Sequence, residues 1–161
     1  MRLALYQPDI PQNAGAMIRL GAALGVGLDI IEPCGFLLTD RGLKRAGMDY
    51  LKSAEIRRHD SWAKFRAGFE AAPARTGGPK QRLLLLTTRG DMAYTDFAFR
   101  PDDTLLVGQE SAGVPPEVHD AADARLVIPM VGGARSLNVA QAAAMVLGEA
   151  LRQTQGFGET V

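Results

Sequence analysis

The sequence predicts an α/β fold in which helices flank a mostly parallel sheet. Short apolar runs bounded by turn residues alternate with longer segments of helical periodicity, which is typical of strand-helix-strand units. Several runs lack the polar and apolar alternation of a half-exposed strand, which indicates burial on both faces of the sheet. With 161 residues, 47% of them hydrophobic and 22% charged, the chain is expected to form a single domain over residues 1–161.

Strands are expected where an apolar run stops at residues that favour turns. The first run ends at Gln7-Pro8-Asp9, because proline has no N–H to donate to a sheet. The expected strands are Leu3–Tyr6, Leu28–Ile31, Leu83–Thr87, Thr104–Val107 and Leu126–Ile128.

Helices are expected where apolar residues recur with the helical period. The last helix has the most regular pattern, since Ala144, Leu147 and Leu151 fall on one face. Ser136 is the expected N-cap of this helix, and Asn13 is the expected N-cap of the first. The expected helices are Asn13–Leu24, Asp40–Ala46, Ser61–Ala71, Pro115–Ala121 and Leu137–Gln153.

Charge is balanced over the whole chain but not along it. There are 18 Lys and Arg residues and 18 Asp and Glu residues, which argues against a general polyanion binder. Between Arg41 and Arg82, however, there are 11 basic and 4 acidic residues. This stretch is either a solvated helical surface or a phosphate-facing patch.

Several classes of protein are excluded by what the sequence lacks. Cys34 has no second cysteine to pair with, and one thiol with two histidines is too few for a structural zinc site. The chain has neither a phosphate-binding loop nor a dinucleotide-binding glycine motif, so no ATP or NAD site is expected. No apolar segment approaches the roughly 20 residues of a membrane span or the core of a signal peptide. A reducing cytoplasm is the expected compartment, and no metal is expected.

Two nucleophilic side chains leave alternatives open. Ser111 lies in Gln109-Glu110-Ser111-Ala112-Gly113, which resembles a hydrolase nucleophile elbow without its first glycine. His119 is the only downstream histidine, so a Ser/His/Asp hydrolase remains an alternative. Cys34 is either a reactive thiol or a small buried hydrophobe.

Three loops rich in glycine, proline and small polar residues adjoin predicted strands, over residues 8–19, 107–116 and 128–138. In an open α/β sheet, ligands bind outside the carboxyl ends of the strands, so loops gathered at that edge form a pocket. In the third loop, free backbone groups and the Ser136 hydroxyl suit a nucleoside, and Met130 adds a soft apolar surface.

The first two loops carry residues with distinct chemistry. Arg19 shares a helical face with Gly15 and Ala16, which are too small to cover it. Its guanidinium therefore reaches a phosphate, a carboxylate or a partner chain, or else it only decorates the surface. Gly108 and Gly113 are expected to allow close approach of the backbone to a ligand.

The three loops, in this order, resemble the three motifs of the SPOUT RNA methyltransferases. The matching residues are Asn13 and Arg19 in P-x-I-P-x-N-x-G-x-x-x-R, Gly108-x-Glu110 with Gly113 and Pro115, and Ile128-Pro129-Met130 followed by Ser136-Leu137-Asn138. Three further segments are similar to the small bacterial members that methylate the 2'-hydroxyl of cytidine 34 in tRNA. They are Ile30-Ile31-Glu32-Pro33, Lys44-Arg45-Ala46-Gly47-Met48-Asp49-Tyr50 and Leu86-Thr87-Thr88-Arg89-Gly90.

The resemblance covers Leu3 to about Gln153 and implies a cofactor and partners. Such enzymes bind S-adenosylmethionine where the C-terminal chain threads a trefoil knot, and they act as homodimers. The implied substrate is the wobble nucleotide of tRNA, cytidine or modified uridine 34, with a leucine tRNA as the expected species. Another tRNA position or ribosomal RNA remains open within the family. Outside it, a non-catalytic flavodoxin-like regulatory or nucleotide-binding domain remains open.

The resemblance also implies roles for the residues that match its motifs. Arg19 and Asn13 correspond to a catalytic edge supplied across the dimer interface, and Ser136 and Asn138 are expected to orient the cofactor or the target ribose. Because an arginine stays protonated near neutral pH, we expect Arg19 to clamp an RNA phosphate rather than act as a general base. The implied cofactor-binding residues are Leu86, Thr87, Gly108, Glu110, Ile128, Met130, Ser136 and Leu137.

The sequence departs from the family pattern at two positions. Gln109 stands where close relatives often have proline, and Gly148 stands where many have tyrosine before the glutamate at 149. On the RNA side, the expected phosphate contacts to the anticodon stem-loop are Arg41, Lys44, Arg45, Arg57 and Arg58.

Overall fold

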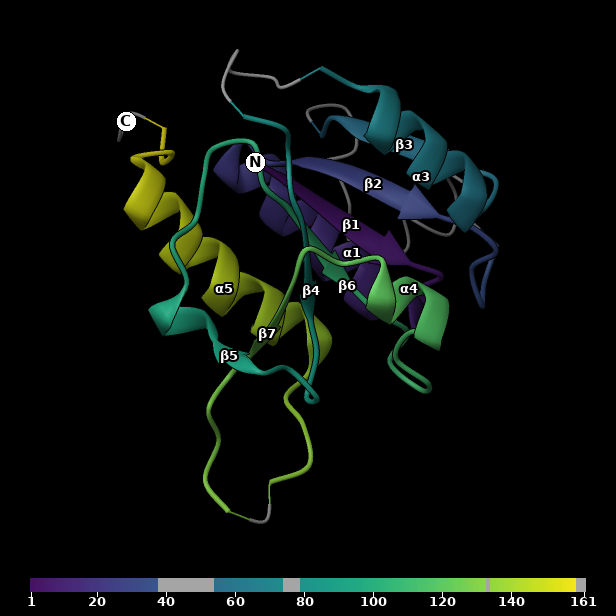
Figure 1. Cartoon of the computed structure of the whole chain (residues 1–161). Helices are drawn as coiled ribbons and strands as arrows, with labels where there is room; N and C mark the ends of the chain where they lie inside the picture. The colour runs from purple at the N-terminus through teal and green to yellow at the C-terminus, as the bar shows by residue number, and fades with distance from the viewer. Residues whose placement is uncertain (38–53, 74–78, 133, 159–161) are drawn as a thin grey trace.

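The structure, a computed structural model, describes residues 1–37, 54–73, 79–132 and 134–158. Its strands are β1 (Arg2–Tyr6), β2 (Gly27–Ile31), β3 (Ile56–His59), β4 (Leu83–Leu86), β5 (Met92–Ala93), β6 (Thr104–Val107) and β7 (Ala124–Val127). They form one parallel sheet in the order β3-β2-β1-β6-β4-β7-β5. The predicted parallel α/β fold is therefore confirmed (Figure 1).

Helices cover both faces of this sheet. They are α1 (Pro11–Leu24), α3 (Trp62–Ala71), α4 (Pro116–Asp120) and α5 (Val139–Thr154), with a short 3-10 helix, η2 (Tyr94–Asp96). Leu3 and Leu5 of β1 are buried in one apolar cluster with α1 and α5, whereas Ala4 and Tyr6 are buried in another with α3 and α4. Successive strand residues point to opposite faces, so this pattern explains why the apolar runs show no polar alternation.

The sequence missed two strands, both with weak apolar signals. β3 is an edge strand whose sequence is Ile-Arg-Arg-His, and the charges of Arg57 and Arg58 hide a strand from any test for apolar runs. Exposed charges are common on edge strands because they discourage pairing with other chains. β5 has only 2 residues. The expected helix Asp40–Ala46 lies outside the described residues.

Two expected helix caps are wrong. Asn13 does not cap α1, because the helix begins at Pro11, whose ring fixes a helical φ angle, and no side chain caps it. Ser136 does not cap α5, because the helix begins three residues later. Its N-cap is Asn138, whose Oδ1 accepts hydrogen bonds from the backbone N–H of Ala140 at 3.0 Å and of Gln141 at 3.3 Å.

An ionic cluster with a buried centre, Arg2 and Asp29, ties the first three strands together. The Arg2 guanidinium donates to Asp29 Oδ2 at 2.5 Å and to Glu55 Oε1 at 2.6 Å. Asp29 Oδ1 lies 2.7 Å from His59 Nε2. Because Arg2 and Asp29 are both buried, each charge depends on the other for its neutralisation. Within the described ranges, no helix is long and apolar enough to cross a membrane.

Two glycines in helices are expected to respond to alanine with opposite signs. A Cβ at Gly21 of α1 would lie 2.2 Å from Leu28 Cδ1 and 2.7 Å from the Val26 carbonyl oxygen. We expect Gly21→Ala to lower the free energy of unfolding by about 1–2 kcal/mol, because overpacking outweighs the gain in helix propensity.

The matched control is Gly68→Ala in α3, where a Cβ would meet nothing within 4 Å. We expect it to raise the free energy of unfolding by about 0.5–1 kcal/mol. Urea unfolding followed by circular dichroism measures both changes. A Gly21→Ala variant as stable as the parent chain would contradict the packing argument.

Candidate active site

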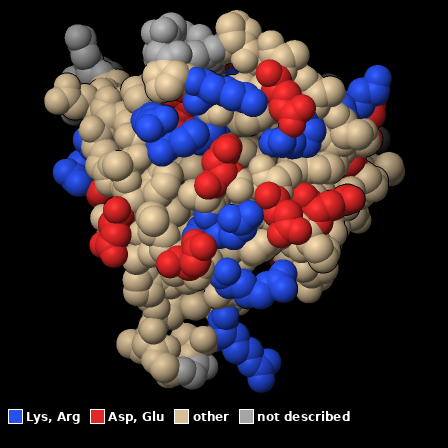
Figure 2. All heavy atoms as spheres, in the orientation of Figure 1, with Lys and Arg blue, Asp and Glu red and all other residues tan. Residues whose placement is uncertain are grey.

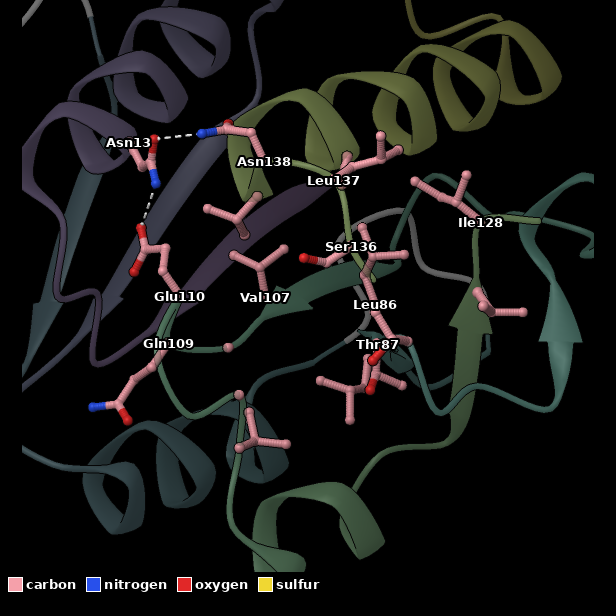
Figure 3. A pocket seen from close by; sticks show the side chains of 18 of the residues that line it. Asn13, Leu86, Thr87, Val107, Gln109, Glu110, Ile128, Ser136, Leu137 and Asn138 are labelled. Carbon is pink, nitrogen blue, oxygen red and sulfur yellow. Dashed lines mark hydrogen bonds between the residues drawn. The ribbon is translucent and has the colours of Figure 1, made fainter. Parts of the chain in front are cut away.

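A cavity of about 580 Å³ lies at the carboxyl ends of β4, β6 and β7 (Figure 3). These strands are neighbours in the sheet, and the register sets Leu86 beside both Val107 and Leu126. The three strands therefore end together, and the segments that follow them form the cavity with the start of α1. This edge is where parallel α/β sheets place their ligands.

The cavity brings together most of the residues singled out in the sequence. All eight expected cofactor positions line it, and so do three of the four expected catalytic residues, Asn13, Ser136 and Asn138. The eight are Leu86, Thr87, Gly108, Glu110, Ile128, Met130, Ser136 and Leu137.

The lining has the chemistry of a nucleoside site. Leu86, Ile128 and Leu137 offer apolar side chains, and Thr87 and Ser136 add hydroxyl groups (Figure 3). A cavity of this volume, mostly apolar with a few polar groups, is of the size that binds small ligands and cofactors. Planar bases bind to apolar walls, and their polar edges need a small number of hydrogen-bond partners.

The loop after β6 closes on itself. Gln109 and Gly113 exchange two backbone hydrogen bonds, each 2.9 Å long, and Gly113 has a φ of +68°, which favours glycine. A Cβ at Gly108 would lie 2.6 Å from the backbone carbon of Gly113. Gly108 and Gly113 therefore allow two parts of the loop backbone to approach each other. The sequence had suggested only that they allow the backbone to approach a ligand. The Gln109 side chain points away from Leu86 and Ser136 (Figure 3).

Hydrogen bonds join the three motif loops. Asn13 Nδ2 donates to Glu110 Oε1 at 3.0 Å, and Asn138 Nδ2 donates to Asn13 Oδ1 at 2.9 Å (Figure 3). Asn13 is thus a link between two loops rather than the helix cap that its type and position suggested. Residues 97 and 125 positions apart in the sequence are fixed against each other by these two contacts.

Asp9 is a residue of this edge that sequence reasoning missed. A side-chain hydrogen bond with Glu110 lowers the pKa of Asp9 to about 2, helped by hydrogen bonds from the Ser111 hydroxyl and from the backbone of both residues. Burial, followed by the neighbouring Asp9 carboxylate, raises the pKa of Glu110. Asp9 falls on a variable position of the first motif, and its place in the loop that follows β1 was the only available signal.

Arg19 does not line the cavity. It is an exposed residue of α1, one helical turn beyond Ala16, which lines a shallow groove between α1 and α5. Leu20, Ala140 and Ala144 also line this groove, and Asn13 and Asn138 border both the groove and the cavity.

The expected RNA contacts are only partly described. Arg41, Lys44 and Arg45 lie outside the described residues. Arg57 and Arg58 are exposed on β3, and each is paired with a carboxylate, Arg57 with Glu55 and Arg58 with Glu32, both at 2.8 Å. RNA contact by these five residues stays a prediction.

The alternatives based on nucleophiles find no support. The Ser111 hydroxyl donates to Asp9, His119 Nδ1 accepts from Arg125 Nε at 3.3 Å, and among the described residues no hydrogen bond joins Ser111 to His119. Burial, and then the Glu32 carboxylate, raises the pKa of the Cys34 thiol to about 11, so it is protonated at neutral pH and a poor nucleophile. In the described part of the chain, no group of three or more His, Cys, Asp or Glu residues is placed to hold a metal.

A parallel sheet with a cavity at its carboxyl edge, lined by three motif loops, is the arrangement in which open α/β proteins bind nucleotides and nucleotide-like cofactors. The sequence profile of the SpoU rRNA Methylase family matches residues 1–148. The chain belongs to the SpoU rRNA methylase family, which confirms the resemblance to the SPOUT RNA methyltransferases.

Individual relatives are similar over the whole chain. A protein of Beijerinckia indica subsp. indica named tRNA (cytidine(34)-2'-O)-methyltransferase is 61% identical over 159 residues, covering 99% of this chain and 95% of its own. A solved structure described as "Structural insights into the 2-OH methylation of C/U34 on tRNA" has a TM-score of 0.85 and 45% identity, with 96% of each chain covered.

A third relative carries a cofactor. The SpoU methyltransferase AviRb from Streptomyces viridochromogenes, solved in complex with AdoMet, has a TM-score of 0.83 and 32% identity. The match covers 95% of this chain and 57% of that one.

Proposed function

We propose that this protein transfers the methyl group of S-adenosylmethionine to the 2'-hydroxyl of nucleotide 34 in tRNA, cytidine or modified uridine. The observation that carries the proposal is that one cavity unites all eight positions matched to the family's cofactor motifs. The 61% identity to a relative named for this reaction supports the choice of nucleotide. A tRNA substrate also favours a cytoplasmic location.

The residues of the cavity fit S-adenosylmethionine. Leu86, Ile128 and Met130 would bury the adenosine, and the backbone after β6 and β7 would bond its polar edge. When bound, this cofactor supplies an electrophilic methyl group on a sulfonium. Ser136 and Asn138 would orient the cofactor or the target ribose, and positioning of this kind lowers an activation barrier by as much as about 7–11 kcal/mol.

Arg19 acts from a second copy of the chain. It is absent from the lining of its own cavity, and it lies one helical turn from Ala16, which lines the groove between α1 and α5 together with Ala140 and Ala144. A homodimer formed over this groove brings Arg19 of each copy toward the cavity of the other, because the groove and the cavity share Asn13 and Asn138. There its guanidinium clamps an RNA phosphate and stabilises negative charge on the attacking oxygen.

The tRNA is recruited by local charge. On the face seen in Figure 2, Lys and Arg side chains are interspersed with Asp and Glu, with no uniformly positive area. Arg41, Lys44 and Arg45 are the proposed phosphate contacts. Arg57 and Arg58 contribute less, because each is already paired with a carboxylate, Glu55 or Glu32.

Methylation of total tRNA with radiolabelled S-adenosylmethionine tests the activity and the position together. We expect the label in one 2'-O-methylated nucleotide at position 34, with a leucine tRNA as the main acceptor. A leucine tRNA with 2'-deoxyribose at position 34 is the matched control, because it lacks only the acceptor oxygen. Label at another tRNA position, or only in ribosomal RNA, would contradict the proposed substrate and would identify the protein as a methyltransferase of that other position or RNA.

Subunit mixing tests the shared site. Arg19→Ala lacks the clamp, and Leu86→Trp fills the cavity, so each variant alone is expected to be nearly inactive while circular dichroism shows it folded. After random exchange, half of the dimers are mixed and each has one complete site, so activity returns to about a quarter of the parent level. A mixture as inactive as the two separate variants would show that Arg19 acts in the site of its own chain.

Salt dependence tests the RNA surface. We expect the triple variant Arg41→Ala, Lys44→Ala and Arg45→Ala to weaken tRNA binding. The plot of log binding constant against log salt concentration should also become shallower by about 2 units of slope, because fewer counterions are released. Affinity for S-adenosylmethionine, measured by calorimetry, should not change. The double variant Arg57→Ala and Arg58→Ala is the comparison, with a smaller loss of slope. An unchanged slope in the triple variant would place the RNA elsewhere.

A further inference from the structure

Asp9 forms a reciprocal clamp with the loop after β6. Its Oδ1 accepts from the Glu110 backbone N–H at 3.0 Å, and its Oδ2 accepts from the Ser111 N–H at 3.3 Å and from the Ser111 hydroxyl. In return, Glu110 Oε2 accepts from the Asp9 N–H at 3.1 Å. Each side chain thus holds the other's backbone, which fixes both the loop and the direction of the Glu110 carboxylate.

Asp9 is also contacted by the segment that follows β2. The N–H of Gly35 donates to the Pro8 carbonyl oxygen at 3.0 Å, and a Cβ at Gly35 would lie 2.8 Å from the Asp9 Cβ. The segment after β2 therefore packs directly on Asp9. A carboxylate supported on one side and bonded by three donors on the other has little freedom to rotate.

The clamp is the first member of a directional series of hydrogen bonds. Glu110 Oε1 accepts the N–H of Asn13, which leaves Asn13 Oδ1 to accept from Asn138 Nδ2. At the other end, the N–H groups of α5 only donate, so Asn138 Oδ1 must face them. Both amide orientations are therefore determined, which Figure 3 shows for the first two bonds.

This orientation leaves each amide a donor for a ligand. One N–H of Asn13 is taken by Glu110, and one N–H of Asn138 is taken by Asn13; no residue in the described part of the chain accepts the second N–H of either. Both asparagines line the cavity. If the Asn13 amide were reversed, its carbonyl oxygen would face the Glu110 carboxyl group. If the Asn138 amide were reversed, the N-terminus of α5 would lose its cap.

We propose that Asp9, which does not line the cavity, is a positioning residue for methyl transfer that acts through Glu110 to orient the amides of Asn13 and Asn138. The inference rests on the proposed function for its catalytic consequence, and on the geometry alone for its effect on the two amides. Without the Asp9 carboxylate, the loop loses three hydrogen bonds and the Glu110 carboxylate can rotate.

The test is Asp9→Ala, with Asp60→Ala as its matched control, because Asp60 is an exposed carboxylate after β3 outside the cavity lining. We expect Asp9→Ala to lower kcat about 10-fold or more at saturating cofactor, as misplacement of catalytic groups does. The 15N–1H signals of the Asn13 and Asn138 side-chain amides should shift. Asp60→Ala should change neither quantity.

A double-mutant cycle separates positioning from a general loss of stability. If Asp9 acts through Asn13, adding Asp9→Ala to Asn13→Ala should cost little further activity, because the path is already broken. Losses that multiply would overturn the proposal, and so would unchanged amide signals. If Asp9→Ala does not give a cooperative unfolding transition, Asp9→Asn replaces it, because asparagine keeps one acceptor oxygen. The same changes in kcat and in the amide signals are then expected.

The parent chain keeps the two proposals distinguishable. A parent without methyltransferase activity would refute the proposed function, and the amide signals would then decide whether the clamp orients the asparagines. A parent with full activity and an Asp9→Ala variant of equal kcat would refute the positioning role alone.

Discussion

The common end point of three parallel strands is the constraint on which the rest of the molecule depends. β4 lies between β6 and β7, and the register makes all three strands stop within a residue of each other. Because helices bury both faces of the sheet, the carboxyl edge is where irregular backbone can gather around a cavity. A shift of one residue in β4 would reverse its buried faces and separate the loops, so core packing and site geometry are set together.

The loops are then fixed to each other by polar contacts of a different kind. Each hydrogen bond between Glu110, Asn13 and Asn138 contributes only about 0.5–1.5 kcal/mol of net stability, which is small beside the burial of the two apolar clusters. The value of these bonds is directional, since they decide which atoms face the cavity. The apolar core thus determines that a pocket exists, and the polar series determines its chemistry.

The sequence predicted the sheet because buried parallel strands leave a clear apolar signal, as Leu83–Leu86 does. It missed β3 because the charged side chains of this edge strand, which discourage pairing with other chains, resemble those of a surface helix. Ser136 and Asn138 are both good capping residues two positions apart, and only the path of the loop decides between them. Asp9 was missed because its partners lie about 100 positions away, a separation that local pattern analysis does not sample.

Asn138 does two things at once, and this limits how the protein can adapt to heat. An aspartate in its place would be at least as good an N-cap and would interact favourably with the helix dipole. It would also lack the N–H that Asn13 accepts. At position 138, a stronger N-cap for α5 would therefore remove a hydrogen bond of the site. Stabilising substitutions are easier at positions such as Gly68 of α3, where an added Cβ meets nothing within 4 Å and the side chain has no part in the site.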